Sequence, residues 1–229
     1  NELGKSEFHN DSGPIMVANK KIKLKMLEEF INASEEKGIP KVNDFNTGDN
    51  FGVGYFQFTT NHNKSLLKLR CSAAKGYLNP VKKRKNLKII TNAHVQKINF
   101  EGTKADSVSF YQGDKLVIAR ARKEIILSAG SIGSPHILQV SGIGNADKLS
   151  KIGIKTIHEL KGVGMNLQDH LMFRPVYKVK NLKSLNGKIN SLFGNLLIGL
   201  EYIFNQSGPM TMGASQVCGF LKSDPSRAT

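Results

Sequence analysis

Residues 125–144 read IILSAGSIGSPHILQVSGIG, and this stretch constrains the fold more than any other part of the chain. A short apolar run is followed by small residues, then by Ser134 and Pro135, and then by a second apolar run. The pattern predicts a strand that enters a covered sheet, a tight turn, and a helix with Ser134 as its N-cap and Pro135 as its first residue. Such a helix points free backbone N–H groups and its positive dipole end outward.

Two glycines in this turn allow two interpretations. Gly130 and Gly133 lack the Cβ atoms that would keep a ligand at a distance, so the turn is a plausible neighbour of a dinucleotide. The alternative is a turn that is glycine-rich only because it packs tightly, and the residues alone favour it, since such turns are common. The stretch GVGMNLQDH at residues 162–170 raises the same question.

Charge bears on the kind of partner. The chain holds 33 Lys and Arg against 18 Asp and Glu, a formal net charge of +15. Most of this charge is lysine spread along the whole chain, and the densest cluster, VKKRKNLK at residues 81–88, carries no nucleic-acid motif. We therefore expect a solvated loop there and no nucleic-acid partner. A non-catalytic basic binding module stays open as a minor alternative, supported by the net charge alone.

The cysteines and the hydropathy pattern bear on metal sites, membrane spans and secretion. Cys71 and Cys218 lie far apart without ligand spacing, so we expect reduced thiols and no metal site. The longest apolar run, residues 191–204, is too short to span a bilayer, and the first residues do not resemble a secretory signal. We expect a cytoplasmic protein, with peripheral association at the inner membrane as an open alternative. The sequence reads as an excerpt from a longer protein.

The remaining pattern predicts a mixed α/β fold. Residues 24–38 place apolar side chains on one helical face before a C-terminal glycine, and residues 54–60 form an aromatic strand pattern. Three extended runs between residues 87 and 127 indicate an antiparallel meander. A strand is expected at residues 171–179 and an amphipathic helix at residues 188–204. Further expected elements are strands at 15–17 and 217–223 and short helices at 71–80 and 146–153.

The motif GSIGSPHILQVSGIG resembles the second signature of the glucose–methanol–choline (GMC) family of flavin-dependent oxidoreductases. The residues that carry the match are Gly130, Ser131, Ser134, Pro135, Leu138, Ser141, Gly142, Ile143 and Gly144. GVGMNLQDH follows at the family's spacing, and FHNDSGPIMVA and RCSAAKGYLNPVKKRKNLKIITNAHVQKI resemble its upstream segments. The resemblance covers essentially the whole chain and follows the choline and alcohol dehydrogenase-like bacterial branch.

The resemblance implies an α/β fold with part of an FAD/NAD(P)-binding-type domain and part of a substrate domain. Residues 1–86 would be substrate-domain or cap segments interleaved with the FAD domain, residues 87–170 part of the FAD domain, and residues 171–229 part of the substrate domain. The implied cofactor is FAD. The residues that the resemblance assigns to the cofactor site are Val95, Ser128, Ala129, Gly130, Asn166, Asp169 and His170.

The resemblance gives these residues distinct roles, and the roles of Val95 and of Asp169 with His170 have alternatives. The backbone of Val95 would contact the adenine of FAD, and residues 128–130 would pass beside the adenylate half. Residues 166–170 would line the inner cavity between the two domains. The alternative for Val95 is that it is a plain strand residue of the core. The alternative for Asp169 and His170 is a buried pair that only holds two segments together by charge-assisted hydrogen bonds.

The implied activity is oxidation of an alcohol, choline or a similar small molecule, by hydride transfer from the alcohol carbon to flavin N5. The family's glycine-rich FAD turn and its catalytic His, which accepts the hydroxyl proton, match nothing in this chain. We therefore expect no catalytic residue here, and no activity or tight flavin binding by the chain alone. His136 is expected to be an ordinary residue on the helix surface. The alternative is a hydroxynitrile lyase-like member of the family with the same cofactor. The electron acceptor stays open between oxygen, a quinone and a carrier protein.

Overall fold

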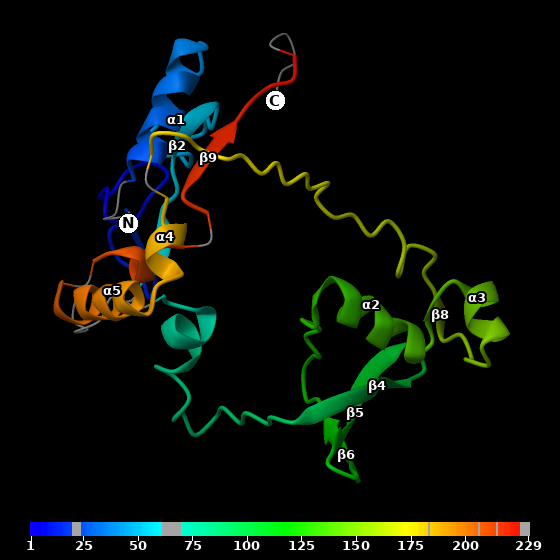
Figure 1. Cartoon of the computed structure of the whole chain (residues 1–229). Coiled ribbons are helices and arrows are strands. Elements are labelled where there is room, and N and C mark those ends of the chain that lie inside the picture. The colour runs from blue at the N-terminus through cyan, green and yellow to red at the C-terminus, as the bar shows by residue number, and fades with distance from the viewer. Residues whose placement is uncertain (20–23, 61–69, 183, 206, 214, 225–229) are drawn as a thin grey trace. The chain divides into compact units, whose positions relative to one another are not determined.

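The computed structural model of the chain describes residues 1–19, 24–60, 70–182, 184–205, 207–213 and 215–224 (Figure 1). The chain forms two compact units, one made of residues 1–87 and 176–229 and the other of residues 88–175. Both units combine helices with strands, which confirms the mixed α/β class. The assignment of residues 1–86, 87–170 and 171–229 to flavin and substrate domains stays a prediction.

The first unit is built on two small antiparallel strand pairs. Strand β1 (Met16–Ala18) pairs with β3 (Phe58–Thr60), and β2 (Gly52–Tyr55) pairs with β9 (Val217–Phe220). Helix α1 (Lys25–Glu36) contacts β2 and buries Ile31 completely. The other helical elements of this unit are η1 (Ala74–Leu78), a π-helix, α4 (Asn186–Ile189), α5 (Leu192–Asn205) and η2 (Pro209–Thr211).

Two elements of this unit differ from the sequence-based expectation. The aromatic strand at 54–60 is interrupted after Tyr55, because β2 and β3 belong to different strand pairs and the chain changes partner between them. The helix expected at 188–204 is divided into α4 and α5 at Ser191. Ser191 Oγ accepts a hydrogen bond from the N–H of Gly194 at 3.3 Å, so this serine starts a new helix instead of continuing the old one.

Residues 171–179 form no strand, which contradicts the strand expected from their alternating pattern. Leu171 and Val176 are more than nine-tenths exposed, at 103% and 93%. In the described part of the chain no strand pairs with this segment. An alternating pattern becomes a strand only when another strand supplies the ladder of hydrogen bonds.

An ion pair ties the N-terminal segment to the loop before β2. His9 Nε2 contacts Asp44 Oδ2, and Asp44 Oδ1 accepts the N–H of Asn46 at 3.0 Å. Burial alone would raise the pKa of Asp44, but the hydrogen bonds from His9 and Asn46 and the charge of His9 together hold that pKa below its usual value of 3.8. The carboxylate therefore stabilises the fold in its ionised form.

The substitution Asp44→Asn is expected to destabilise the protein in a pH-dependent way. A carboxyl whose pKa is lowered on folding stabilises above its unfolded pKa and loses that effect as pH falls through the folded pKa. The wild type should therefore exceed the variant by about 1 kcal/mol at pH ~6, and the difference should shrink below pH ~4. Urea denaturation at several pH values measures this, with Asp11→Asn at an exposed position as control. A difference that stays constant down to pH ~2 would contradict the role of the ionised carboxylate.

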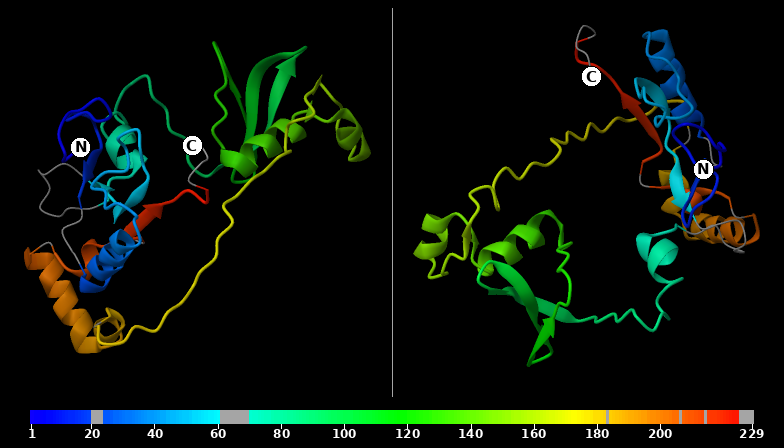
Figure 2. Two further views of the ribbon diagram at one scale, coloured as in Figure 1. Left: turned by 90° about the horizontal axis from the view of Figure 1, so that it is seen from above. Right: turned by 180° about the vertical axis from the view of Figure 1, so that it is seen from behind.

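The second unit contains the predicted antiparallel meander. Strands β4 (Ala93–Glu101), β5 (Lys104–Gln112) and β6 (Lys115–Arg120) pair in sequence order. Helix α2 (Gly130–Val140) lies along the β4 side of this sheet (Figures 1 and 2). The N–H of Ile98 in β4 donates to Ser141 Oγ at 2.9 Å, and this bond fixes the end of the helix to the sheet.

A short parallel pair completes this unit. Strand β7 (Ile143–Gly144) follows α2 directly and pairs with β8 (His158–Glu159). Between them lies α3 (Ala146–Lys151), capped by Asn145, whose Oδ1 accepts the N–H of Lys148 at 2.9 Å. Helix α3 confirms the short helix expected at residues 146–153.

Candidate cofactor-binding cleft

Helix α2 begins earlier than expected. Its first residue is Gly130, at φ +84°, and Ala129 precedes it as the capping residue. The Oγ of Ser134 accepts the N–H of Ala129 at 3.0 Å, so this serine reaches back over the first turn from inside the helix. The prediction that Ser134 is the N-cap and Pro135 the first residue is therefore wrong. Pro135 lies inside the helix, where it has no N–H to donate to the Ser131 carbonyl, so α2 lacks one helical hydrogen bond there.

The covered strand expected just before this helix is also absent. Residues 121–129 have no strand assignment, and Ile126 is 79% exposed. Within the described residues no strand pairs with this apolar segment. The segment approaches α2 as irregular chain, and residues 128–130 are exposed where the helix starts.

A cavity of about 830 Å³ lies between α2 and the loop at residues 162–168, and we call it the α2 cleft. Its lining residues are Ser131, Ile132, Ser134, Pro135, His136, Leu138, Gln139, Gly162, Val163, Gly164, Met165, Asn166, Leu167 and Gln168. The two small-residue motifs of the sequence thus form the two walls of one cavity. Its volume falls within the range of about 300–1,000 Å³ typical of small-molecule sites.

The second wall is a loop of successive turns. The N–H of Leu160 donates to the Gly144 carbonyl at 3.0 Å, which joins the start of the loop to β7. Two turn bonds follow, from the N–H of Val163 to the Leu160 carbonyl and from the N–H of Met165 to the Gly162 carbonyl, both at 3.1 Å. The backbone then reaches Asn166 in the left-handed region, at φ +58°. Asparagine tolerates this conformation better than most residues do.

The structure brings together some of the predicted site residues. Asn166 lines the cleft, and Ser128, Ala129 and Gly130 lie immediately before its lining residue Ser131. Asp169 and His170 lie just beyond the lining residue Gln168, and both are exposed. Asp169 Oδ1 accepts the backbone N–H of its neighbour His170 at 2.8 Å. The interpretation of these two residues as a buried pair that joins two segments is therefore wrong.

Val95 lies apart from these residues in the sheet. It is half-buried in β4, opposite Phe110 of β5, and is not among the residues that line the cleft. Its backbone adjoins an irregularity in the β4–β5 register between Val95 and Lys97. The proposed contact of Val95 with adenine stays a prediction.

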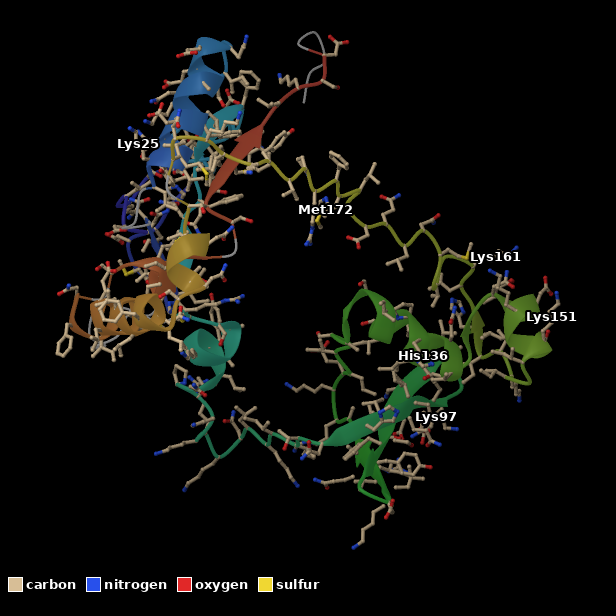
Figure 3. The ribbon with its side chains drawn as sticks, in the orientation of Figure 1. Lys25, Lys97, His136, Lys151, Lys161 and Met172 are labelled. Atoms are coloured by element: carbon tan, nitrogen blue, oxygen red, sulfur yellow. The ribbon has the colours of Figure 1, made fainter. Side chains whose placement is uncertain are left out.

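Two cleft residues were not found from the sequence. His136 was expected to be an ordinary surface residue, and Gln139 was not singled out, yet both line the cleft from α2 (Figure 3 labels His136). The signal that identifies them is helical spacing, because residues 132, 136 and 139 follow one another at intervals of four and three. His136 and Gln139 already lay on the predicted helix, and the start at Gly130 adds Ile132 to their face.

The electrostatics of the cleft favour an anionic or neutral ligand. None of its lining residues is acidic, and the first turn of α2 contains no carboxylate. The N–H groups of that turn supply donors and a positive dipole end. Lys148 Nζ lies 3.4 Å from Met165 Sδ and adds a cation beside the loop. Among the described residues, no group of three or more His, Cys, Asp or Glu could hold a metal ion.

Comparison with known proteins decides the family. The sequence model described as GMC oxidoreductase matches residues 4–172. The chain belongs to the GMC oxidoreductase family. An oxygen-dependent choline dehydrogenase from Pectobacterium atrosepticum is 35% identical to this GMC chain over 223 residues, which are 97% of the chain and 39% of that relative. The resemblance stated from the signature motif is therefore confirmed.

Solved structures show the same fold. An FAD-dependent oxidoreductase from Chaetomium thermophilum matches 94% of this GMC chain, and 37% of its own, with a TM-score of 0.79 and 28% identity. A fungal aryl-alcohol oxidase matches 91% of the chain, and 35% of its own, with a TM-score of 0.73 and 25% identity. The GMC chain thus spans about two fifths of the length of these proteins. The comparisons give the lyase alternative no support.

Proposed function

We propose that this chain is the middle portion of an FAD-dependent oxidoreductase that acts on the CH–OH group of a small alcohol, in the manner of choline dehydrogenases. The observation that carries the proposal is the α2 cleft, in which the two GMC motifs of the chain form opposite walls. The relative from Pectobacterium atrosepticum is named a choline dehydrogenase, and the fungal relative an aryl-alcohol oxidase, so both names describe alcohol chemistry.

The residues of the cleft fit part of an FAD site. The adenylate half of FAD carries a pyrophosphate, and the first turn of α2, whose backbone N–H groups lack helical partners, borders a cavity without carboxylates. We propose that Ser128, Ala129 and Gly130 hold the adenylate half and that Asn166 contacts the cofactor from the opposite wall. Val95 would contact the adenine through its backbone. Asp169 and His170, exposed at the end of the loop, would meet the cofactor or the substrate side of the complete site.

The chemistry divides between the cofactor and the protein. When bound, FAD supplies the hydride acceptor for the alcohol carbon. The residues of this chain bind and orient the cofactor and exclude water from one side of it. The group that accepts the hydroxyl proton is proposed to belong to another part of the complete protein.

The proposed partners are a small alcohol and an electron acceptor, which is oxygen, a quinone or a carrier protein. Activity assays with each acceptor distinguish the three. The proposed location is the cytoplasm, with peripheral association at the inner membrane as the alternative. Across the residues that the structure describes, no helix combines the length and apolar character needed to cross a bilayer.

The substitution Ser131→Asp tests whether α2 faces an anionic part of the cofactor. Ser131 lines the cleft within the first turn of the helix. A carboxylate there stabilises the helix through its dipole but repels a phosphate. We expect the complete protein to keep its thermal stability and to bind FAD at least about tenfold more weakly, since two like charges near 4 Å cost more than 1.4 kcal/mol at a protein surface.

Ser131→Asn is the matched control, because it has nearly the same size as aspartate and no charge. FAD affinity is measured by titrating the apoprotein and following flavin fluorescence. We expect weak FAD binding for Ser131→Asp and wild-type FAD binding for Ser131→Asn. Equal affinity in both variants would show that no phosphate lies at this end of α2.

A further inference from the structure

Gln139 connects the two walls of the α2 cleft. It lies in the last turns of α2, is half-buried, and its Nε2 donates to the Val163 carbonyl at 3.2 Å. A Cβ atom on Gly164 would lie 2.5 Å from the same Nε2, closer than real Cβ contacts come. A Cβ on Gly144 would lie 3.4 Å from Gln139 Cγ. The Gln139 side chain therefore packs directly against glycine backbone in the loop and in β7.

The loop at residues 162–168 forms few other polar contacts with α2. Its start is joined to β7 through Leu160 and Gly144, and its two turns are closed by bonds within the loop itself. Among the α2 side chains that the structure describes, Gln139 is the one that forms a hydrogen bond to this loop. The other side-chain contact, Lys148 with Met165, comes from α3 and is exposed. The hydrogen bond of the Gln139 carboxamide is therefore the direct polar contact between α2 and this wall.

We infer that Gln139 is a positioning residue for the cofactor, one that holds the loop at 162–168 at the distance from α2 that the ligand requires. This inference rests on the proposed function. A carboxamide can donate to the Val163 carbonyl, whereas a leucine cannot donate and a carboxylate would repel that oxygen. Without the bond, only a fraction of the molecules holds the binding-competent cleft, and the apparent Kd rises by the inverse of that fraction.

The first experiment measures FAD binding in the complete protein that contains this chain. Gln139→Leu and Gln139→Glu are compared with the wild type at a temperature where all are folded, by FAD titration and by the visible circular dichroism of the bound flavin. We expect the Kd for FAD to rise about two- to tenfold, the worth of one hydrogen bond, with a changed dichroism. Gln112→Leu, at the exposed end of β5, is the control and should change neither.

The outcomes separate positioning from simple stabilisation. If the Gln139 variants melt at a lower temperature but keep the wild-type Kd and dichroism, the residue is only structural and the inference is overturned. A wild-type protein that binds no FAD would instead overturn the proposed function. The two failures are distinguishable because only the first leaves a flavin on the wild type.

A second experiment tests the contact itself without using the cofactor. Gly164→Ala introduces a methyl group against Gln139 and, at φ +76°, also strains the backbone. In a Gln139→Ala background the methyl group has room and only the strain remains. We expect Gly164→Ala to shift the denaturation midpoint less in that background than in the wild type. Equal shifts in both backgrounds would show that the two residues are not in contact and would overturn the inference.

Discussion

Gly142→Ala is expected to lower the free energy of unfolding of residues 88–175 by about 2–5 kcal/mol. Gly142 ends α2 at φ +88°, which costs an L-residue about 1–2 kcal/mol. A Cβ at this position would also lie 2.6 Å from the Lys155 carbonyl oxygen and 3.0 Å from Ile157 Cγ1. The backbone cannot move away freely, because the Gly142 carbonyl accepts the N–H of Ile157 at 2.8 Å. Urea denaturation followed by circular dichroism measures the loss.

Gly153→Ala is the matched control for this substitution. Gly153 has a similar backbone conformation, at φ +74°, but nothing lies within 4 Å of the place where its Cβ would be. The free energy of unfolding of the Gly153→Ala variant should fall only by the cost of the strained backbone, about 1–2 kcal/mol. Equal losses at the two positions would mean that the close approach of α2 and the segment before β8 does not exist.

Ile31→Ala is expected to cost about 2–5 kcal/mol in the first unit, within the range for truncation of a buried isoleucine. Ile31 is fully buried on the inner face of α1, at 0% exposure. The truncation removes the apolar contacts of that face and leaves a cavity that the helix can only partly close. Thermal and urea denaturation of the variant give the cost.

Phe30→Ala is the control, at the next residue of the same helix. Phe30 is 59% exposed, so its truncation should cost less than about 1 kcal/mol although it removes more atoms. A larger loss for Phe30→Ala than for Ile31→Ala would contradict the orientation of α1.

Elements defined by local pattern agreed with the sequence-based expectation. Helix α1 ends before Gly38 as predicted, because the apolar face and the terminal glycine lie within one short segment. The meander β4–β5–β6 also follows from local hairpins. Residues 171–179 and 125–129 form no strands, since a strand needs a pairing partner from another part of the chain, and the described residues offer none.

The candidate site could be predicted in its motifs but not in its geometry. The family resemblance pointed to Gly130 and Asn166, and the structure places the α2 start and Asn166 on one cavity. The true helix start depended on the conformation of Gly130, which no pattern specifies. Gln139 gains its meaning only from Gly164, a residue on the opposite wall, so it could not be recognised from α2 alone.

Anaerobic titration of the complete protein with choline and with benzyl alcohol, followed through the visible absorbance of the flavin, tests whether the α2 cleft belongs to an FAD-dependent enzyme that oxidises alcohols. We expect that FAD is present and that at least one of the two alcohols bleaches it, because hydride transfer from the alcohol reduces the flavin. A protein without flavin would contradict the proposed cofactor site at the α2 cleft. A flavin that stays oxidised with both of these alcohols would contradict the assignment as an alcohol-oxidising enzyme of the choline dehydrogenase type.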